Sequence, residues 1–358
     1  TVFLTGLLLY LFREPIFGLG AAAIIALHPW VQRYTVEGRG YALLLAFFLL
    51  SMIFLHAALR NRRWWAWAGY GAAQFAFLYS FAGAVYLAVA LNLLVAVEIF
   101  FAERKTGRLL VAFSRWAVVN TLCVMALVQL LLPHVVQVSQ MWQDGEFSGK
   151  MGADWLLDCW VHAAAGIPHN TTASTTLQFG VSLQLMGEKL DPLSWIGMGV
   201  IPAACDAGFF RALDGKPRTL RIMTLAALFA TAMAYFLAAR SGYRLFSWYF
   251  LYTVPVLVIL MFYSMDWFTW ILGRGKLRRA GEAVLALGLV AIYAGFAYLP
   301  LDRLLRFERQ PLKSAVETIF GETSPPELAA RTDALRAVFG KDKDNMAIYD
   351  PGVRVVKS

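Results

Sequence analysis

The feature that most constrains this chain is a series of apolar runs, each about as long as a bilayer's hydrocarbon core is thick. A helix that crosses a membrane needs about 20 predominantly apolar residues. Runs that meet or approach this length occupy residues 1–12, 16–32, 40–59, 64–80, 82–101, 116–133, 195–210, 219–239, 247–271 and 281–300. We therefore expect an all-α transmembrane protein, a polytopic helical bundle with about ten spans.

Composition supports a membrane protein. Of the 358 residues, 59% are hydrophobic and only 15% are charged, whereas soluble domains carry about 25% Asp, Glu, Lys and Arg. The chain therefore has too few charges to coat a water-soluble surface of its size. Its three cysteines do not form a disulfide framework, and the sequence contains no cysteine and histidine spacing typical of a metal site. We expect neither a metal nor a cofactor.

The basic residues divide the connectors into two classes. Arginine and lysine gather in alternate connectors, at Arg13, 60–63, 104–115, 211–221 and 274–279. By the positive-inside rule these connectors face the cytoplasm. The segments that then lie on the opposite face are 33–39, 134–194, 240–246 and 301–358. The net charge of +9 is therefore a topology signal, and nucleic-acid binding is not expected.

Two longer polar segments set the expected domain organisation. The parts are N-terminal transmembrane helices (1–133), a large non-cytoplasmic loop (134–194), C-terminal transmembrane helices (195–300) and a non-cytoplasmic soluble tail (301–358). In the tail, Pro325 to Gly340 predicts a short helix, and NMAIYDPGVRVVKS predicts a strand, a turn and a second strand. A small outer α/β segment is therefore expected. Because the chain opens at Thr1 inside an apolar run and stops at Ser358, we expect further sequence at both ends.

Within the large loop, ADWLLDCWVHAAAGI predicts a helix that brings Trp155, Leu156, Cys159 and Val161 near one another. Two interpretations remain open. The helix either lies at the membrane interface or packs into a small core formed by the loop itself.

Ionisable groups inside a span are costly and are candidates for function. Four acids qualify: Glu37, Glu98, Asp206 and Asp266. Glu98 and Asp206 lie within a turn or two of basic connectors, and Asp266 lies near Trp267 on the same side. For these three we expect snorkelling or pairing with a nearby arginine, because they do not form the closely spaced acid or histidine series that a proton relay favours.

A more specific cluster of candidate functional residues lies in HPWVQRYTVEGRGY, a turn between two predicted spans on the outer face. It contains His28, Arg33, Tyr34, Glu37, Arg39 and Tyr41. Arginine offers fork-like donors that suit a phosphate or diphosphate, so these residues form a candidate clamp. The alternative is that Glu37 pairs with Arg33 or Arg39 and only satisfies the turn.

The stretch ALHPWVQRYTVEGRGYALLLAFFLLSMIFLHAAL resembles polytopic glycosyltransferases of the family 39 type. These belong to the GT-C superfamily, which includes protein mannosyltransferases and lipid A aminoarabinose transferases. In bacterial members a span ends in Pro and is followed by a turn with Glu, Arg and Tyr. Pro29, Glu37, Arg39 and Tyr41 fit that order, and a basic cluster ends the next span.

Two further stretches are similar to that family. WAWAGYGAAQFAFLYSFAGAVYLAV resembles its next hairpin, with Phe81 where many relatives have His. FSWYFLYTVPVLVIL resembles a late span, with Tyr249 and Pro255 at the expected separation. Trp248 stands where relatives have Arg, although Arg244 lies one turn earlier.

The resemblance implies an integral-membrane glycosyltransferase, multi-pass in a bacterial inner membrane. It would transfer a sugar from a polyprenyl-phosphate donor to an acceptor (protein, lipid or glycan) on the non-cytoplasmic face. Arg33, Arg39 and Arg244 would bind the lipid phosphate, Glu37 would orient an arginine, and the cleft would be lined by Tyr34, Tyr41 and Tyr249. Acceptor contacts would come from Asp154, Asp158, His162 and His169.

Family members carry their catalytic acid in the first outer loop, which is expected upstream of Thr1, so no catalytic residue is assigned here. Two other functions remain open. A polytopic transporter or lipid flippase would share the same composition, and so would a non-catalytic membrane scaffold.

Overall fold

The structure is a computed structural model, and it describes ten stretches of the chain. These are residues 1–13, 15–36, 40–104, 107–132, 154–167, 192–214, 217–242, 245, 247–265 and 276–306. Within them the chain forms 12 α-helices, two short 3-10 helices and no strand. The all-α prediction is confirmed for this part of the chain. The predicted α/β segment of the tail lies outside the described residues.

Six helices are long and apolar enough to cross a membrane. They are α4 (Tyr41–Asn61), α6 (Val85–Glu103, preceded by the 3-10 helix η1, Ala82–Ala84), α7 (Leu109–Leu131), α12 (Pro192–Asp214), α13 (Arg218–Ser241) and α16 (Lys276–Arg306). A seventh candidate is the pair α2 (Pro15–Leu27) and α3 (Pro29–Val36), which is bent by 64° at its break. The chain is therefore a multi-pass integral membrane protein.

The described residues thus give six or seven candidate spans where the sequence predicts about ten. The difference lies in short helices. α1 (Val2–Phe12) and α14 (Thr253–Tyr263) have 11 residues each, and α5 (Trp64–Ser80) has 17. An 11-residue helix rises only about 16 Å, roughly half the thickness of the hydrocarbon core. The runs at 1–12 and 64–80 are themselves shorter than 20 residues, and the run at 247–271 opens with a 3-10 helix before α14 begins at Thr253.

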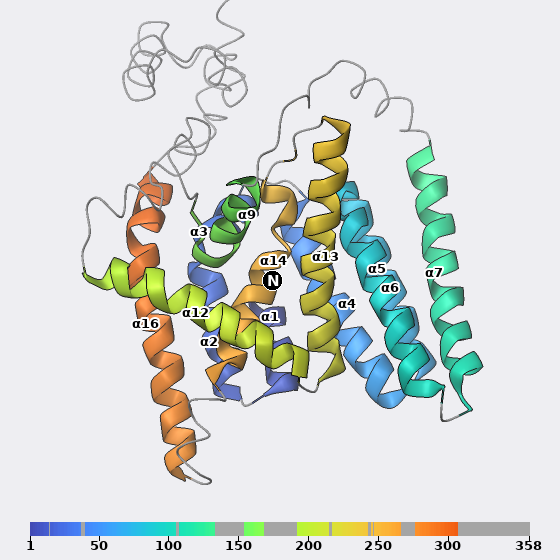
Figure 1. The fold of residues 1–358 in the computed structure, drawn as a ribbon, viewed down its shortest axis with the longest axis horizontal. Coiled ribbons are helices and arrows are strands. Elements are labelled where there is room, and N and C mark those ends of the chain that lie inside the picture. The colour runs from blue at the N-terminus through green and yellow to red at the C-terminus, as the bar shows by residue number, and fades with distance from the viewer. Residues whose placement is uncertain are drawn as a thin grey trace, which may run out of the picture. The chain divides into compact units, whose positions relative to one another are not determined.

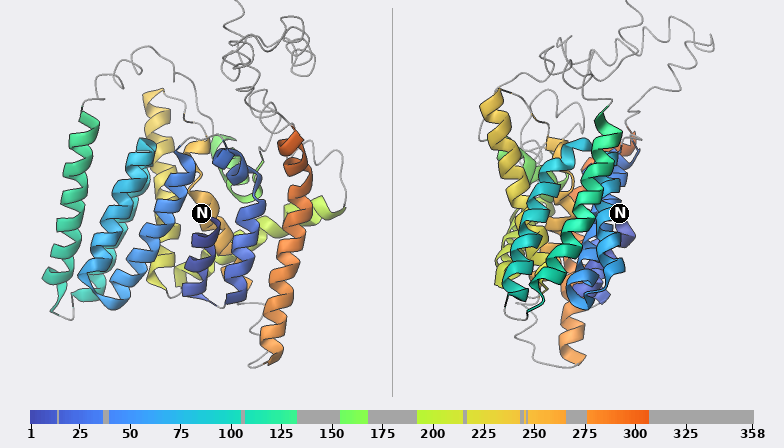
Figure 2. Two further views of the ribbon diagram at one scale, coloured as in Figure 1. Left: turned by 180° about the vertical axis from the view of Figure 1, so that it is seen from behind. Right: turned by 90° about the vertical axis from the view of Figure 1, so that its right-hand side faces the viewer.

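By their contacts, the residues divide into two compact units. The first comprises Thr1–Gly166 and Leu190–Ala297, and the second comprises Ile167–Lys189 and Tyr298–Ser358. The described part of the second unit is Ile167 and the last residues of α16. In the first unit, α4, α5, α6 and α7 follow one another toward one edge (Figures 1 and 2). α13 packs on α6, and α14 packs between α12 and α2.

The helix ends that carry the basic connectors meet at one end of the first unit. Arg62, after α4, forms an ion pair of 2.7 Å with Glu103 at the end of α6. Arg218 and Arg221, at the start of α13, bind Glu98 of α6 at 3.1 and 2.6 Å. The arginine pairing expected for Glu98 is thereby confirmed. These contacts join three connectors that the sequence places on one side of the membrane, and the positive-inside rule assigns that side to the cytoplasm.

A polar network links α5, α6 and α7 within their apolar surroundings. The Asn92 side-chain oxygen accepts hydrogen bonds from Tyr70 (3.3 Å), Gln74 (3.4 Å) and Trp116 (3.3 Å). The Asn92 amide nitrogen donates to the Gln74 side-chain oxygen at 2.7 Å and to the Ala88 carbonyl at 2.9 Å. Lipid offers polar groups no alternative partner, so such bonds hold helices together in a membrane.

Glycines bring two helix pairs into close backbone contact. A Cβ at Gly18 of α2 would lie 2.6 Å from the carbonyl oxygen of Gly6 in α1. A Cβ at Gly208 of α12 would overlap the Leu260 carbonyl of α14. Small residues at such crossings permit the close van der Waals packing that drives helix association in membranes. These contacts hold α2 against α1 and α14 against α12.

Candidate functional site at the broken span

The break between α2 and α3 follows from its sequence. Pro29 is the first residue of α3, a position that tolerates proline because its backbone nitrogen needs no partner there. Proline also disfavours helical geometry in the residue before it, so α2 ends at Leu27 and His28 lies in the break. The His28 carbonyl then accepts a hydrogen bond from the Gln32 N–H at 3.0 Å, which begins the new helix.

The His28 side chain stabilises this bend. Its ring is fully buried, with Nε2 3.2 Å from the Ala163 carbonyl oxygen and Nδ1 3.4 Å from the Val31 backbone N–H. A carbonyl only accepts and an N–H only donates, so the proton resides on Nε2 and the ring is neutral. His28 thus caps α3, ties it to α9 (Asp154–Ala165) and stacks on Tyr293 of α16. These contacts account for His28 as a structural residue.

Beside the bend, aromatic side chains from five separate segments form a continuous series of ring contacts. His162 stacks on Trp30 at 4.9 Å, Trp30 meets Tyr34 at 6.2 Å, and Tyr34 meets Tyr41 at 4.9 Å between ring centroids. Phe81, which follows α5, lies 5.1 Å from Tyr41 and 5.2 Å from Tyr249 of the 3-10 helix η3 (Ser247–Phe250). We call this set the aromatic row: His162, Trp30, Tyr34, Tyr41, Phe81 and Tyr249.

Chain direction places most of the aromatic row at the end opposite the basic connectors. α4 runs from Tyr41 to the connector at Arg62, and α5 runs from that connector back to Phe81. η3 follows α13, which begins at the arginines paired with Glu98. The row therefore lies on the side that the positive-inside rule assigns to the outside.

Arg33 brings a cation to the aromatic row. Its guanidinium carbon lies 5.2 Å from the centre of the Tyr34 ring, and the residue is only 8% exposed. A guanidinium over an aromatic face is attracted by the negative charge of the ring's π-system. The structure thus brings four of the predicted donor-site residues together: Arg33, Tyr34, Tyr41 and Tyr249. The other three, Glu37, Arg39 and Arg244, lie outside the described residues.

The large loop contributes α9, which packs on membrane helices. Trp155 donates a hydrogen bond of 2.7 Å to the Leu245 carbonyl, stacks on Tyr235 of α13 and meets Phe250 edge-on. α9 also contacts η3, α14 and α12. The predicted helix is therefore confirmed, but its core is shared with the transmembrane bundle instead of being formed by the loop alone.

The predicted acceptor residues have different surroundings. His162 is 1% exposed and stacked on Trp30, so it lies in the interior of the unit. Asp154 and Asp158 are on α9, but their side chains, like His169, lie outside the described part. The sequence interpretation passed over Trp30 as a member of the cluster and recorded Phe81 only as a departure from a motif. Trp30 lies three residues before Arg33, and that position could have indicated it, whereas Phe81 has no predicted site residue near it in sequence.

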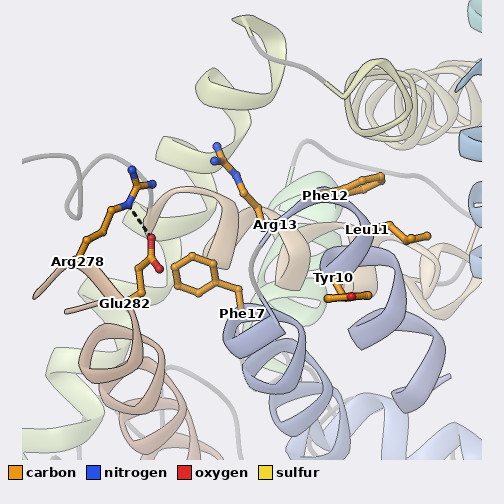
Figure 3. Close-up of a pocket in the computed structure, with 7 residues that line it drawn as sticks. All are labelled: Tyr10, Leu11, Phe12, Arg13, Phe17, Arg278 and Glu282. Carbon is orange, nitrogen blue, oxygen red and sulfur yellow. Dashed lines mark hydrogen bonds and ion pairs between the residues drawn. The ribbon is translucent and has the colours of Figure 1, made fainter. Parts of the chain in front are cut away.

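Two cavities lie at the basic end of the first unit. One, of about 320 Å³, is bordered by Tyr10 to Arg13, Phe17, Arg278 and Glu282 (Figure 3). In it, buried Glu282 accepts a hydrogen bond of 2.9 Å from Arg278 on the same helix. The second cavity, of about 410 Å³, lies between α6 and α13 around Glu98. Both are separate from the aromatic row.

Among the described residues, no group of three or more His, Cys, Asp and Glu side chains is placed to hold a metal ion. Comparison with known proteins returns no matching family model, no matching curated protein and no matching solved structure.

Proposed function

We propose that the protein is an integral-membrane glycosyltransferase of the GT-C type. It would move a sugar from a polyprenyl-phosphate donor to an acceptor on the non-cytoplasmic side of the membrane. The observation that carries this proposal is the contact of Tyr41, Phe81 and Tyr249. Each comes from a different one of the three stretches that resemble the family 39 enzymes, and such a contact is what a site shared by the three stretches requires.

The chemistry of the aromatic row suits such a donor. Aromatic rings present flat apolar faces with a polar edge on tyrosine, which fits a sugar at the membrane boundary. Cations are needed to stabilise the phosphate that leaves when the sugar is transferred. Arg33 would supply one such charge, and Arg39 and Arg244 would supply others. A lipid phosphate is already a fair leaving group, so this transfer does not require a metal-bound nucleotide sugar.

The remaining roles complete the proposal. Glu37 would orient an arginine, and Tyr34, Tyr41 and Tyr249 would line the cleft. The base that deprotonates the acceptor is not assigned to any residue of this sequence. The family 39 assignment and a bacterial inner membrane location belong to the same proposal, and the acceptor is left as a protein, a lipid or another glycan.

A second function, transport or flipping of a lipid or small solute, is favoured by one observation. The pair α2 and α3 forms a helix broken by 64°, and broken helices at matching positions line the binding sites of many transporters. The chain shows no internal repeat, which such transporters often have, so we rank this function below sugar transfer.

Full-length protein in lipid nanodiscs, given a polyprenyl-phosphate donor with a radiolabelled sugar, tests the proposal. With no acceptor added, water would receive the labelled sugar, and we expect slow release of unglycosylated polyprenyl phosphate together with the free sugar. Arg33→Gln should lower kcat about 10²- to 10³-fold, the cost of removing one charge-stabilising donor. Arg63→Gln, an exposed arginine at the basic end, serves as the matched control and should leave kcat unchanged.

Because Arg33 is buried, its loss could reduce folding, and Arg39→Ala provides a second variant. It should lower turnover far more than it lowers folded yield in detergent. Equal losses of turnover and folded yield would make the arginine structural. If the sugar–phosphate bond stays intact and the donor moves between leaflets in liposomes, the protein is a flippase and the proposed sugar transfer is wrong.

A further inference from the structure

The cavity between α6 and α13 has an apolar wall and a charged end. Its wall consists of Leu94, Val97, Phe101, Ala102, Ile222 and Leu225. Its charged end holds Glu98, Arg218 and Arg221. Two arginines and one glutamate leave a net positive charge at a place where apolar helix surface begins. This combination differs from an ordinary surface ion pair, which has no cavity beside it.

The two guanidiniums retain hydrogen-bonding capacity. Arg218 contacts Glu98 through Nε at 3.1 Å, and Arg221 contacts the other carboxylate oxygen through Nη2 at 2.6 Å. A guanidinium carries several N–H donors in a fork that suits carboxylate and phosphate groups. Glu98 is 12% exposed, whereas the arginine side chains are 46% and 37% exposed. The nearly buried carboxylate thus positions both guanidiniums, whose side chains stay partly exposed.

The start of α13 adds to this positive field. Arg218 is its first residue, and the N-cap position is Pro217, whose side chain offers no capping hydrogen bond. Backbone N–H groups in the first turn of a helix and the positive end of its dipole favour an anion. This contribution is independent of the arginine side chains and acts at the same end of the cavity.

The apolar wall opens toward the lipid. Val97 is 44% exposed and Phe101 is 59% exposed, and both belong to a membrane-spanning helix. A ligand here would place an anionic head against the arginines and an apolar tail along α6. Juxtamembrane Lys and Arg attract anionic lipids of the cytoplasmic leaflet, and basic pockets between helices on that side bind lipid head groups.

We propose that this cavity is a binding site for an anionic phospholipid of the cytoplasmic leaflet. Charge complementarity and the lipid-facing wall identify that occupant. The site lies at the basic end, so it is distinct from the aromatic row and does not depend on the function proposed for that row.

Native mass spectrometry of the full-length protein in detergent, with phosphatidylglycerol and phosphatidylcholine as the two probes, tests this site. We expect at least tenfold tighter retention of phosphatidylglycerol. The double variant Arg218→Gln/Arg221→Gln should lose about 25-fold in affinity for phosphatidylglycerol, from roughly fivefold per arginine near the surface. Its affinity for phosphatidylcholine should not change.

Arg60→Gln/Arg63→Gln is the matched control, because it removes two exposed arginines from the same end of the first unit. It should keep its phosphatidylglycerol affinity within about twofold, as it leaves the cavity intact. Equal losses in the two double variants would show general charge attraction and overturn the site. Equal binding of phosphatidylglycerol and phosphatidylcholine by the unaltered protein would also overturn the site.

A second variant acts on the apolar wall and leaves the ion pairs in place. Ala102→Trp should fill the cavity and lower phosphatidylglycerol retention at least tenfold, with a melting temperature close to that of the parent. Unchanged retention would contradict the proposal even where the arginine variant fails to fold. Millimolar glycerol 3-phosphate should displace little bound lipid, and full displacement would identify a site for soluble phosphate instead.

Discussion

Replacing Asn92 by leucine tests the hydrogen-bond network that joins α5, α6 and α7. Leucine has the same number and branching of side-chain heavy atoms, so the substitution removes polar bonds without opening a cavity. It would break the bonds to Tyr70, Gln74 and Trp116. It would also leave the Gln74 amide, on a residue that is 1% exposed, without its partner on α6.

The size of the effect follows from the geometry. Cross-helix hydrogen bonds in membrane proteins contribute about 0.6 kcal/mol on average and about 1.7 kcal/mol at most. The 2.7 Å bond from Asn92 to Gln74 belongs to the stronger class. The three donors that share the Asn92 oxygen at 3.3–3.4 Å exceed its two lone pairs and belong to the weaker class. We expect a loss of about 2 to 3 kcal/mol in the free energy of unfolding.

The assay is reversible unfolding in mixed micelles of increasing SDS content, followed by tryptophan fluorescence. Asn120→Leu is the matched control. Like Asn92, Asn120 donates a hydrogen bond from its side-chain amide to the carbonyl four residues earlier, here that of Trp116 at 2.8 Å. The described residues show no cross-helix partner for the Asn120 side chain. The substitution should cost less than about 0.5 kcal/mol. Similar losses in both variants would refute the stabilising role of the network. In a double-mutant cycle, Gln74→Leu should cost less in the Asn92→Leu background, because no buried amide is then left unpaired.

Two other substitutions test how α9 and α12 pack on their neighbours. Trp155→Phe removes the 2.7 Å hydrogen bond to the Leu245 carbonyl while keeping a ring on Tyr235. It should lower the free energy of unfolding by about 1 kcal/mol in the same assay. No change would mean that the bond does not stabilise α9. Gly208→Ala would push a methyl group into the Leu260 backbone and should cost at least about 3 kcal/mol or abolish folding. Gly199→Ala on the same helix meets open space and should be neutral or slightly stabilising, so equal effects of the two alanines would contradict the close contact of α12 with α14.

The sequence predicted the helical class and the grouping of the basic connectors well. Both depend on local properties: a run of apolar residues must be helical in lipid, and arginines mark connectors one by one. The span count was less accurate, because a helix end is set by local geometry. Pro29 bends the second run, and the run at 247–271 opens with a 3-10 helix before α14 begins at Thr253.

The proximity of candidate residues could be inferred where they lie close in sequence and was harder to infer across the chain, and their roles stay predictions. Tyr34 and Tyr41 are seven positions apart and meet in the structure. Trp30 and His162 come from distant segments, and their stacking depends on α9 packing beside α3. A pattern in one stretch of sequence carries no information about which distant helix will cover it. The sequence therefore suggested His162 only as an acceptor contact of the loop and gave no sign that it is buried against Trp30.

The position of α7 has a consequence for how this chain can change over evolutionary time. Most of its apolar side chains are exposed, among them Leu110, Leu122 and Val128, and among described elements its main neighbours are α5 and α6. Fluid hydrocarbon makes no demand on shape, so this face is free to drift among leucine, isoleucine, valine and phenylalanine. Trp116, which bonds Asn92, is anchored by a partner and is expected to vary far more slowly.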